Sequence, residues 1–205
     1  MARVITDEIV EPVVGALRGA IDVEDGATDE QEISWDEPTL RKMADHAEAN
    51  AELAARLHTL QDLPPGTLGH QYVEFYRRNG LQMPGDDPNS PTVFVAHDMN
   101  HVIAGYEPTG QGEIALGAMQ LGIADNDAHW LQFLGNLGVH EAGYLRVGEL
   151  VPKTASLTRA GAPEMLAQAF TRGAACTGDF TDIDHLALVE VPLADVREQF
   201  GVPPT

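Results

Sequence analysis

Apolar residues recur every three or four positions along most of this chain, and that spacing constrains the fold more than any other feature. Such a spacing places the apolar side chains on one face of an α-helix. No alternating pattern of the kind that marks β-hairpins recurs, so the sequence predicts an all-α protein. The clearest stripe consists of Leu40, Met43, Ala47, Ala51, Ala54 and Leu57.

Proline and glycine divide the chain into the expected helices. The segment LPPGT (63–67) ends the helix that carries this stripe, and Thr67 is placed to cap a helix that Asn79 and Gly80 end. We expect a single-domain helical bundle over residues 36–205, preceded by an acidic N-terminal helix and linker at 1–35. Further helices are expected at 92–105, 113–124, 128–140, 163–175 and 192–201, although TVFV (92–95) alone could form a strand.

The charge balance excludes several kinds of partner. The chain has 12 Lys and Arg residues against 32 Asp and Glu residues, a formal net charge of −20. Residues 1–50 contribute 13 acids and 4 bases, a net of −9, which is nearly half of the excess. A nucleic-acid partner is not expected, because phosphate binding needs a cationic face. The single cysteine, Cys176, excludes an intrachain disulfide and a zinc site built from several cysteines.

The sequence also indicates where in the cell the protein is expected. The first residues carry acids where a secretory signal would carry bases. The longest charge-free apolar runs, 114–124 and 129–140, are too short to cross a bilayer. We therefore expect a cytoplasmic protein with no transmembrane segment, attached to a membrane at most peripherally.

The segment His97-Asp98-Met99-Asn100-His101 carries the strongest chemical signal. On a helix, His97 and His101 lie one turn apart on the same face, where two imidazoles can bind one metal ion. Asp98 is rotated by about 100° from His97, so it is either a third ligand at the side of the site or an acceptor that fixes a histidine tautomer. A histidine pair at this spacing also occurs by chance on solvated or packed faces.

A carboxylate, Glu113, follows the two histidines in the sequence and could join them at a metal site. The chain turns through a segment rich in glycine and proline (105–112), and Glu113 comes next. A tight turn between antiparallel helices would bring Glu113 back to the face of His97 and His101. Two histidines and a carboxylate with an open position form the ligand set of a catalytic zinc ion or another divalent ion.

These residues resemble the coenzyme Q biosynthesis protein 4 family (Coq-four). The pattern His-Asp-x-x-His, followed after eleven residues by Glu, is similar to the signature of that family. The resemblance extends in order over about residues 40–202, with Asn100 standing where the family has an aromatic residue. The similar segments are MADHAEANAELAARL (43–57), LPPGTLGHQYVEFYRRNGL (63–81), HDMNHVIAGYEPTGQGEIAL (97–116) and PLADVREQFGV (192–202).

The resemblance implies a function in ubiquinone biosynthesis. It implies a divalent metal held by His97, Asp98, His101 and Glu113, with zinc first and magnesium or iron as alternatives. It further implies a prenylated quinone precursor or another lipid as ligand, a homodimer, and other quinone-biosynthesis proteins as partners. The implied reaction is oxidative decarboxylation of the ring's C1 carbon, with the same four residues as the catalytic group.

Residues for the ligand are less well marked. Tyr72 and Tyr76 are placed to line the mouth of a cavity, and Met119 to contact a lipid tail. The glycines of the helices 113–124 and 128–140, among them Gly117 and Gly122, leave room between backbones for such a tail. From the periodicity alone, we expect most of the apolar residues of these two helices to be core; this set includes Ile114, Leu116, Leu121, Ile123, Trp130, Leu131, Phe133 and Leu134.

Two other functions fit the sequence. One is a non-catalytic lipid-binding or scaffold protein with a structural metal. The other is a metal-dependent hydrolase of the His-Asp type, which would need an upstream histidine and a downstream aspartate. The candidates for that role are His58, His70, Asp125 and Asp127.

Overall fold

The computed structural model describes residues 51–86, 93–143 and 156–204. The expected acidic region at 1–35 lies outside them. Within these ranges every regular element is a helix, which confirms the all-α fold, and the one β-type pairing there is an isolated bridge between Thr67 and Pro192. The elements are a helix over 51–59, η2 (Leu60–Asp62), α3 (Leu68–Asn79), α4 (Val93–Ala104), α5 (Gly110–Ile123), α6 (Asp127–Asn136), η3 (Leu137–Ala142), η4 (Ser156–Thr158), α7 (Ala162–Ala175), η5 (His185–Ala187) and α8 (Leu193–Phe200).

Helix α3 begins and ends where the sequence predicts. The Thr67 hydroxyl accepts a hydrogen bond from the backbone N–H of His70, which satisfies a donor that the first helical turn leaves free. Gly80 follows with φ of 65°, a left-handed conformation that costs glycine nothing. Other boundaries differ more: the helix expected over 128–140 ends as α6 at Asn136, and the chain continues as the π-helical turn η3.

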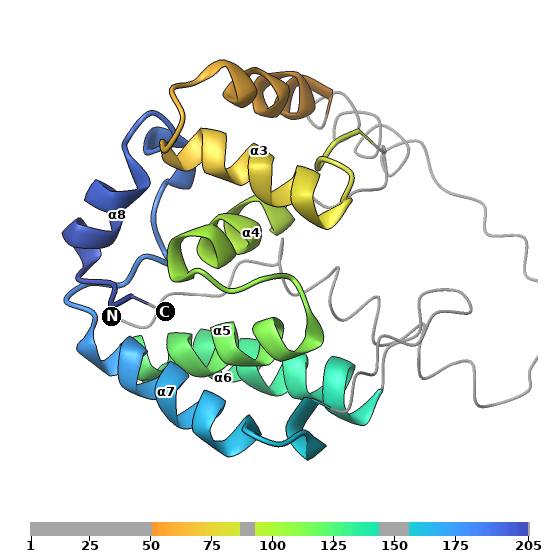
Figure 1. The fold of residues 1–205 in the computed structure, drawn as a ribbon, viewed down its shortest axis with the longest axis vertical. Coiled ribbons are helices and arrows are strands. Elements are labelled where there is room, and N and C mark those ends of the chain that lie inside the picture. The colour runs from red at the N-terminus through yellow and green to blue at the C-terminus, as the bar shows by residue number, and fades with distance from the viewer. Residues whose placement is uncertain (1–50, 87–92, 144–155, 205) are drawn as a thin grey trace, which may run out of the picture.

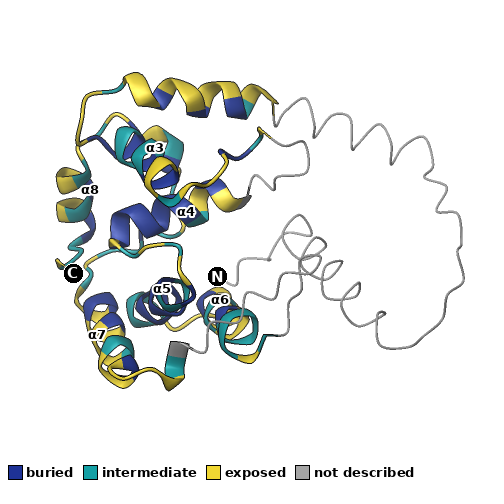
Figure 2. Ribbon diagram, turned by 45° about the vertical axis from the view of Figure 1, so that its right-hand side comes forward, coloured by how far each residue is buried: buried dark blue, intermediate teal, exposed yellow. Residues whose placement is uncertain are grey.

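Helix α4 occupies the middle of the molecule. In Figure 1, α3 and α8 lie on one side of it and α5, α6 and α7 on the other. Figure 2 shows buried residues concentrated on α4 and α5 and on the inner sides of the helices around them. Residues 93–95, part of a segment that alone could form a strand, lie in α4 instead. The largest buried side chains of the core include Leu57, Leu68, Tyr72, Phe75, Met99, Ile103, Leu116, Met119, Phe180 and Val196.

Glycine lets α5 and α7 approach closely. A Cβ atom on Gly173 would lie 2.0 Å from the carbonyl oxygen of Met119, and one on Gly122 would lie 2.3 Å from that of Phe170. A Cβ on Gly117 would lie 3.0 Å from the Cα of Phe133. These glycines therefore allow the helix backbones to pack in direct contact. The room expected there for a lipid tail is filled by protein atoms.

The expectation of core packing is wrong for most of the apolar residues of α6. Trp130, Leu131 and Leu134 are 46%, 53% and 56% exposed, because α6 packs on α5 through its other face. Helical periodicity identifies an apolar face but does not say whether a neighbour covers it. No helix in the described ranges is both long enough and apolar enough to cross a membrane.

Replacing Gly173 by alanine tests the close contact between α5 and α7. We expect the free energy of unfolding to fall by about 1 to 3 kcal/mol, because a backbone carbonyl must move to admit the methyl group. Urea denaturation measures this. In the control Gly135→Ala the new Cβ meets nothing within 4 Å, so the helix should gain up to about 1 kcal/mol. Equal effects of the two substitutions would contradict the argument.

Candidate functional site

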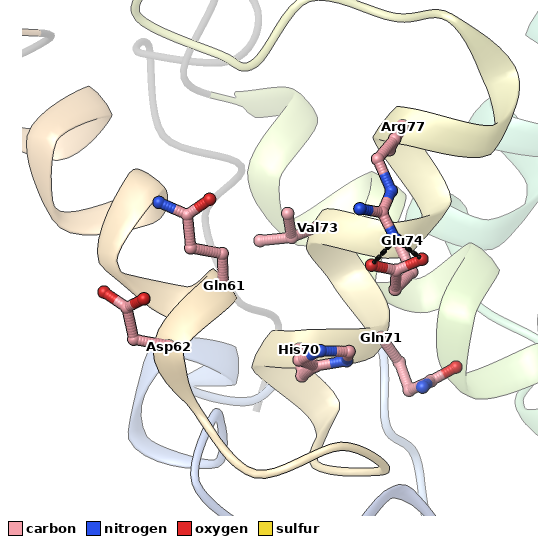
Figure 3. Close-up of a pocket in the computed structure, with 7 residues that line it drawn as sticks. All are labelled: Gln61, Asp62, His70, Gln71, Val73, Glu74 and Arg77. Atoms are coloured by element: carbon pink, nitrogen blue, oxygen red, sulfur yellow. Dashed lines mark hydrogen bonds and ion pairs between the residues drawn. The ribbon is translucent and has the colours of Figure 1, made fainter.

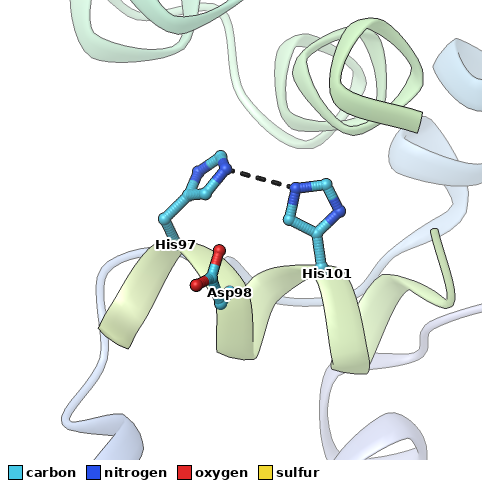
Figure 4. A group of neighbouring side chains, drawn as sticks. All are labelled: His97, Asp98 and His101. Atoms are coloured by element: carbon cyan, nitrogen blue, oxygen red, sulfur yellow. Dashed lines mark hydrogen bonds between the residues drawn. The ribbon is translucent and has the colours of Figure 1, made fainter. Parts of the chain in front are cut away.

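Helix α4 presents two histidine side chains on one face, toward α5. The ring centroids of His97 and His101 lie 4.8 Å apart, and their Nε2 atoms lie 3.2 Å apart (Figure 4). His101 is fully buried, and its ring stacks on Phe75 of α3 at a centroid distance of 5.8 Å. The spacing of one helical turn thus brings two nitrogen donors together in the interior.

The turn between α4 and α5 brings Glu113 to these histidines. Glu113 lies in the first turn of α5, which Thr109 caps by accepting a hydrogen bond from the N–H of Gly112. A Cβ on Gly112 would lie 1.9 Å from the carbonyl oxygen of Glu107, so the turn closes tightly only with glycine there. As a result, Glu113 Oε2 lies 3.1 Å from His97 Nε2, and Oε1 lies 3.1 Å from His101 Nε2.

A backbone carbonyl decides the tautomer of His101. Its Nδ1 lies 3.1 Å from the carbonyl oxygen of Tyr106, an acceptor, so Nδ1 carries the proton and donates it. In a neutral ring Nε2 then offers a lone pair, and that lone pair faces the carboxylate of Glu113. Two acceptors in contact repel unless a proton or a cation lies between them. A histidine whose other nitrogen donates to a backbone carbonyl is the usual arrangement of a metal ligand.

Asp98 lies beside this group but has a different partner. The hydroxyl of Tyr76, on α3, donates a hydrogen bond to Asp98 Oδ2. One ligand atom each from His97, Asp98 and His101 lie within 4.8 Å of one another, so these three residues could also hold a metal ion (Figure 4). In the described residues, Asp98 makes no ion pair with either histidine.

Burial and charge shift the pKa values of the cluster in different directions. Burial by itself would raise the pKa of Glu113, but hydrogen bonds and charge from His101 and His97 hold it well below its usual range. Burial would lower the pKa of His97, and the contact with Glu113 outweighs this and raises it. For Asp98 burial dominates and raises the pKa. The pKa values of the two carboxyl groups, Glu113 and Asp98, are therefore shifted in opposite directions.

Two arginines that no sequence motif predicts hold the C-terminal end of α4. Arg172 of α7 donates from Nη2 to the carbonyl of Ala104 over 2.8 Å, and its guanidinium lies 5.0 Å from the ring centroid of Tyr106. Arg197 of α8 donates to the carbonyls of residues 102 and 103. Cations stabilise the C-terminus of a helix, but no local signal links arginines so distant in the sequence to α4.

Replacing Arg172 by glutamine should destabilise the fold by about 2 to 4 kcal/mol, because it leaves the buried carbonyl of Ala104 and the partly buried carbonyl of Pro203 without their donor. Chemical denaturation measures the loss. The matched control is Arg77→Gln, which removes an exposed ion pair with Glu74 and should change stability by less than about 1 kcal/mol. A similarly small change for Arg172→Gln would show that Arg172 does not anchor α4.

A second buried histidine supports the opposite side of α4. His185 of η5 lies with Nε2 2.8 Å from Asn100 Oδ1, at hydrogen-bond distance, and both side chains are buried. Burial lowers the pKa of His185, although hydrogen bonds to the carbonyls of Ile183 and Phe180 partly oppose this. Asn100 is therefore positioned by a partner from the C-terminal segment.

This lowered pKa predicts a pH dependence of stability. A histidine with a folded pKa below its ordinary 6.5 binds protons more readily when unfolded, so stability falls as the pH falls through about 6.5. We expect the free energy of unfolding to depend less steeply on pH in His185→Gln than in the unaltered protein, measured by urea denaturation from about pH 7.5 to 5.5. Parallel curves would contradict this assignment.

Two of the hollows that the described residues form lie near these elements. The larger, of about 530 Å³, lies between η2 and α3, and Figure 3 shows that its lining is mainly polar. It includes His70 but none of the four candidate ligands. The smaller, of about 190 Å³, reaches Asp98 and Tyr76. Tyr72 and Met119, expected to contact a ligand, are fully buried in the core and line neither hollow.

The residues expected for a His-Asp hydrolase do not gather at the cluster. His58 Nε2 contacts Asp86 at 2.6 Å on the surface. Asp125 accepts a hydrogen bond from Trp130 Nε1. None of the four candidates belongs to the group in the described residues that could hold a metal ion.

The fold and the cluster define a class: a helical protein with a buried group of histidines and carboxylates that could hold a cation. No family model matches the sequence, and no curated protein matches it. A crystal structure of a candidate ubiquinone biosynthesis protein from Nostoc punctiforme PCC 73102 is similar, with a TM-score of 0.50 and 18% identity. The match covers 97% of this chain and 94% of that protein. At this identity the likeness shows a shared fold.

Proposed function

We propose that this protein binds a divalent metal ion at His97, His101 and Glu113, with Asp98 beside them, and acts in ubiquinone biosynthesis. One observation carries the proposal: two imidazole nitrogens and the two oxygens of one carboxylate converge, with contacts of 3.1–3.2 Å. Ligand atoms of a tetrahedral zinc site lie about 3.3 Å apart. The spacing therefore fits donors that share one ion.

The surrounding residues fit a metal centre as well. The bond from His101 to the carbonyl of Tyr106 directs its free lone pair to the centre of the group. Glu113 supplies negative charge that offsets that of the cation. A bound divalent ion would act as a Lewis acid toward an oxygen of the ligand. Zinc suits two imidazoles with a carboxylate, and iron and magnesium are the alternatives.

The assignment to a pathway rests on the fold and on the sequence pattern together. The fold is shared with the Nostoc protein, and the metal-binding pattern resembles that of the coenzyme Q biosynthesis protein 4 family. We infer that the ligand is a prenylated quinone precursor and that the reaction is oxidative decarboxylation of the ring's C1 carbon. A homodimer, contacts with other proteins of the pathway, and a cytoplasmic location with peripheral membrane contact belong to the same proposal.

Metal analysis tests the site directly. We expect the purified protein to contain about one divalent ion per chain, and His97→Ala and Glu113→Ala to lose it, because each removes one donor of the converging group. His58→Ala is the control, since His58 lies on the surface with Asp86 as its contact. Full metal retention in both cluster variants would refute the metal centre.

A second experiment separates the candidate functions. Solvent extraction of the purified protein should release a bound prenyl lipid, and the protein should show no hydrolysis of phosphodiesters. Bound lipid together with release of CO₂ from a prenylated hydroxybenzoate supports the decarboxylase. Bound lipid without CO₂ release supports the non-catalytic scaffold, and hydrolysis without bound lipid supports the hydrolase.

A further inference from the structure

The peptide carbonyl of Glu113 has a hydrogen-bond donor from a neighbouring helix. Asn136, the last residue of α6, donates from Nδ2 to this oxygen over 2.6 Å. Because Glu113 lies in α5, its carbonyl also accepts the backbone N–H of Gly117 in the α-helical pattern. The bond from Asn136 is therefore additional to those that the helix itself needs. It joins α6 to the residue that carries the candidate carboxylate ligand.

Gly117 lets α6 come close enough for this bond. It lies one turn after Glu113, and a Cβ atom there would lie 3.0 Å from the Cα of Phe133 and 3.5 Å from Nδ2 of Asn136. Figure 2 shows α5 and α6 side by side. The short side chain of Asn136 reaches the backbone of α5 because the two helices pack this closely.

The amide of Asn136 is fixed at both ends. Its Oδ1 accepts a hydrogen bond from Nε2 of Gln132 over 3.2 Å, one turn earlier on α6, and this bond directs Nδ2 toward α5. Asn136 is 8% exposed. Burying an amide costs free energy unless the amide is hydrogen-bonded, whereas an apolar side chain of similar size would fill the position without that requirement. The amide is therefore explained by the carbonyl that it holds.

The two contacts of the Glu113 carboxylate make its position sensitive to small movements of α5. Its Oε2 lies 3.1 Å from Nε2 of His97, and its Oε1 lies 3.1 Å from Nε2 of His101, one turn further along α4. A movement of α5 along α4 would lengthen one contact as it shortens the other. In the described residues, α5 packs mainly on α6 and α7 and only slightly on α4. The position of Glu113 relative to the histidines therefore depends on how α6 and α7 hold α5.

We propose that Asn136 is a positioning residue of the metal centre, an inference that rests on the proposed metal site. Through its bond to the Glu113 carbonyl, Asn136 holds the first turn of α5 where both carboxylate oxygens face the two histidines. It acts through the backbone of Glu113 and is not itself a ligand. Residues that orient metal ligands in this indirect way commonly contribute about tenfold or more to metal affinity.

Cobalt binding provides the test. Co²⁺ replaces zinc in many sites, and its visible absorption reports the arrangement of its ligands. Asn136→Leu and Asn136→Ala both remove the donor; leucine keeps the volume of the side chain, and alanine adds no bulk. We expect each variant to bind Co²⁺ about tenfold more weakly than the unaltered protein. We also expect the absorption spectrum of the bound ion to change.

The matched control is Gln120→Leu. Gln120 is a buried amide on the same helix as Glu113, 4% exposed, and its Oε1 has no hydrogen-bond partner in the described residues. This variant should keep both the affinity for Co²⁺ and the spectrum of the unaltered protein. Urea denaturation of the metal-free proteins measures the stability of each variant separately from its metal binding.

The outcomes separate this inference from the proposed function. If the unaltered protein binds no Co²⁺, the metal centre fails and this inference fails with it. If the unaltered protein binds Co²⁺ and both Asn136 variants keep its affinity and its spectrum, the metal centre stands and the positioning role is wrong. Equal losses of affinity in the Asn136 variants and in Gln120→Leu would also overturn the inference, because they would reflect the general packing of α5.

Discussion

The interface between α4 and α5 contains ionisable groups that would be costly to bury singly, and the surrounding helices are arranged to compensate them. Glu113 is opposed by two imidazoles, and Asp98 by the hydroxyl of Tyr76. Unpaired charge in a protein interior costs several kcal/mol, so each of these side chains depends on its neighbours for its position. The cluster therefore limits how α4 can pack against α5. It is also the candidate functional site of the molecule.

Residues at the C-terminal end of α4 help to hold this cluster in place. The carbonyl of Tyr106 sets the tautomer of His101, and the ring of Tyr106 lies under the guanidinium of Arg172. The same arginine binds a carbonyl in the last turn of α4 and one near the C-terminus of the chain. Because α7 supplies Arg172, and α7 packs on α5 through glycine contacts, the helix that carries Glu113 and the helix that carries the histidines are held by one set of interactions.

Much of the candidate site could be predicted because it is local. His97, Asp98 and His101 lie within one turn of one helix, and Glu113 follows after a short turn that glycine makes tight. What could not be predicted comes from distant segments: Tyr76 holds Asp98 from α3, and His185 holds Asn100 from η5. Spacing along a helix determines which side chains share a face, and it contains no information about which distant residue will meet that face.

The sequence by itself determined the helical class, the ends of α3, and the pairing of two histidines, since periodicity, capping and helix geometry act over a few residues. The tertiary structure alone decided which apolar faces are covered. It buried Met119 and Tyr72 in the core and left Trp130 and Leu134 exposed. It also paired Asp98 with the hydroxyl of Tyr76 from α3. These outcomes depend on how helices pack, and packing is settled by the shapes and charges of all the elements together.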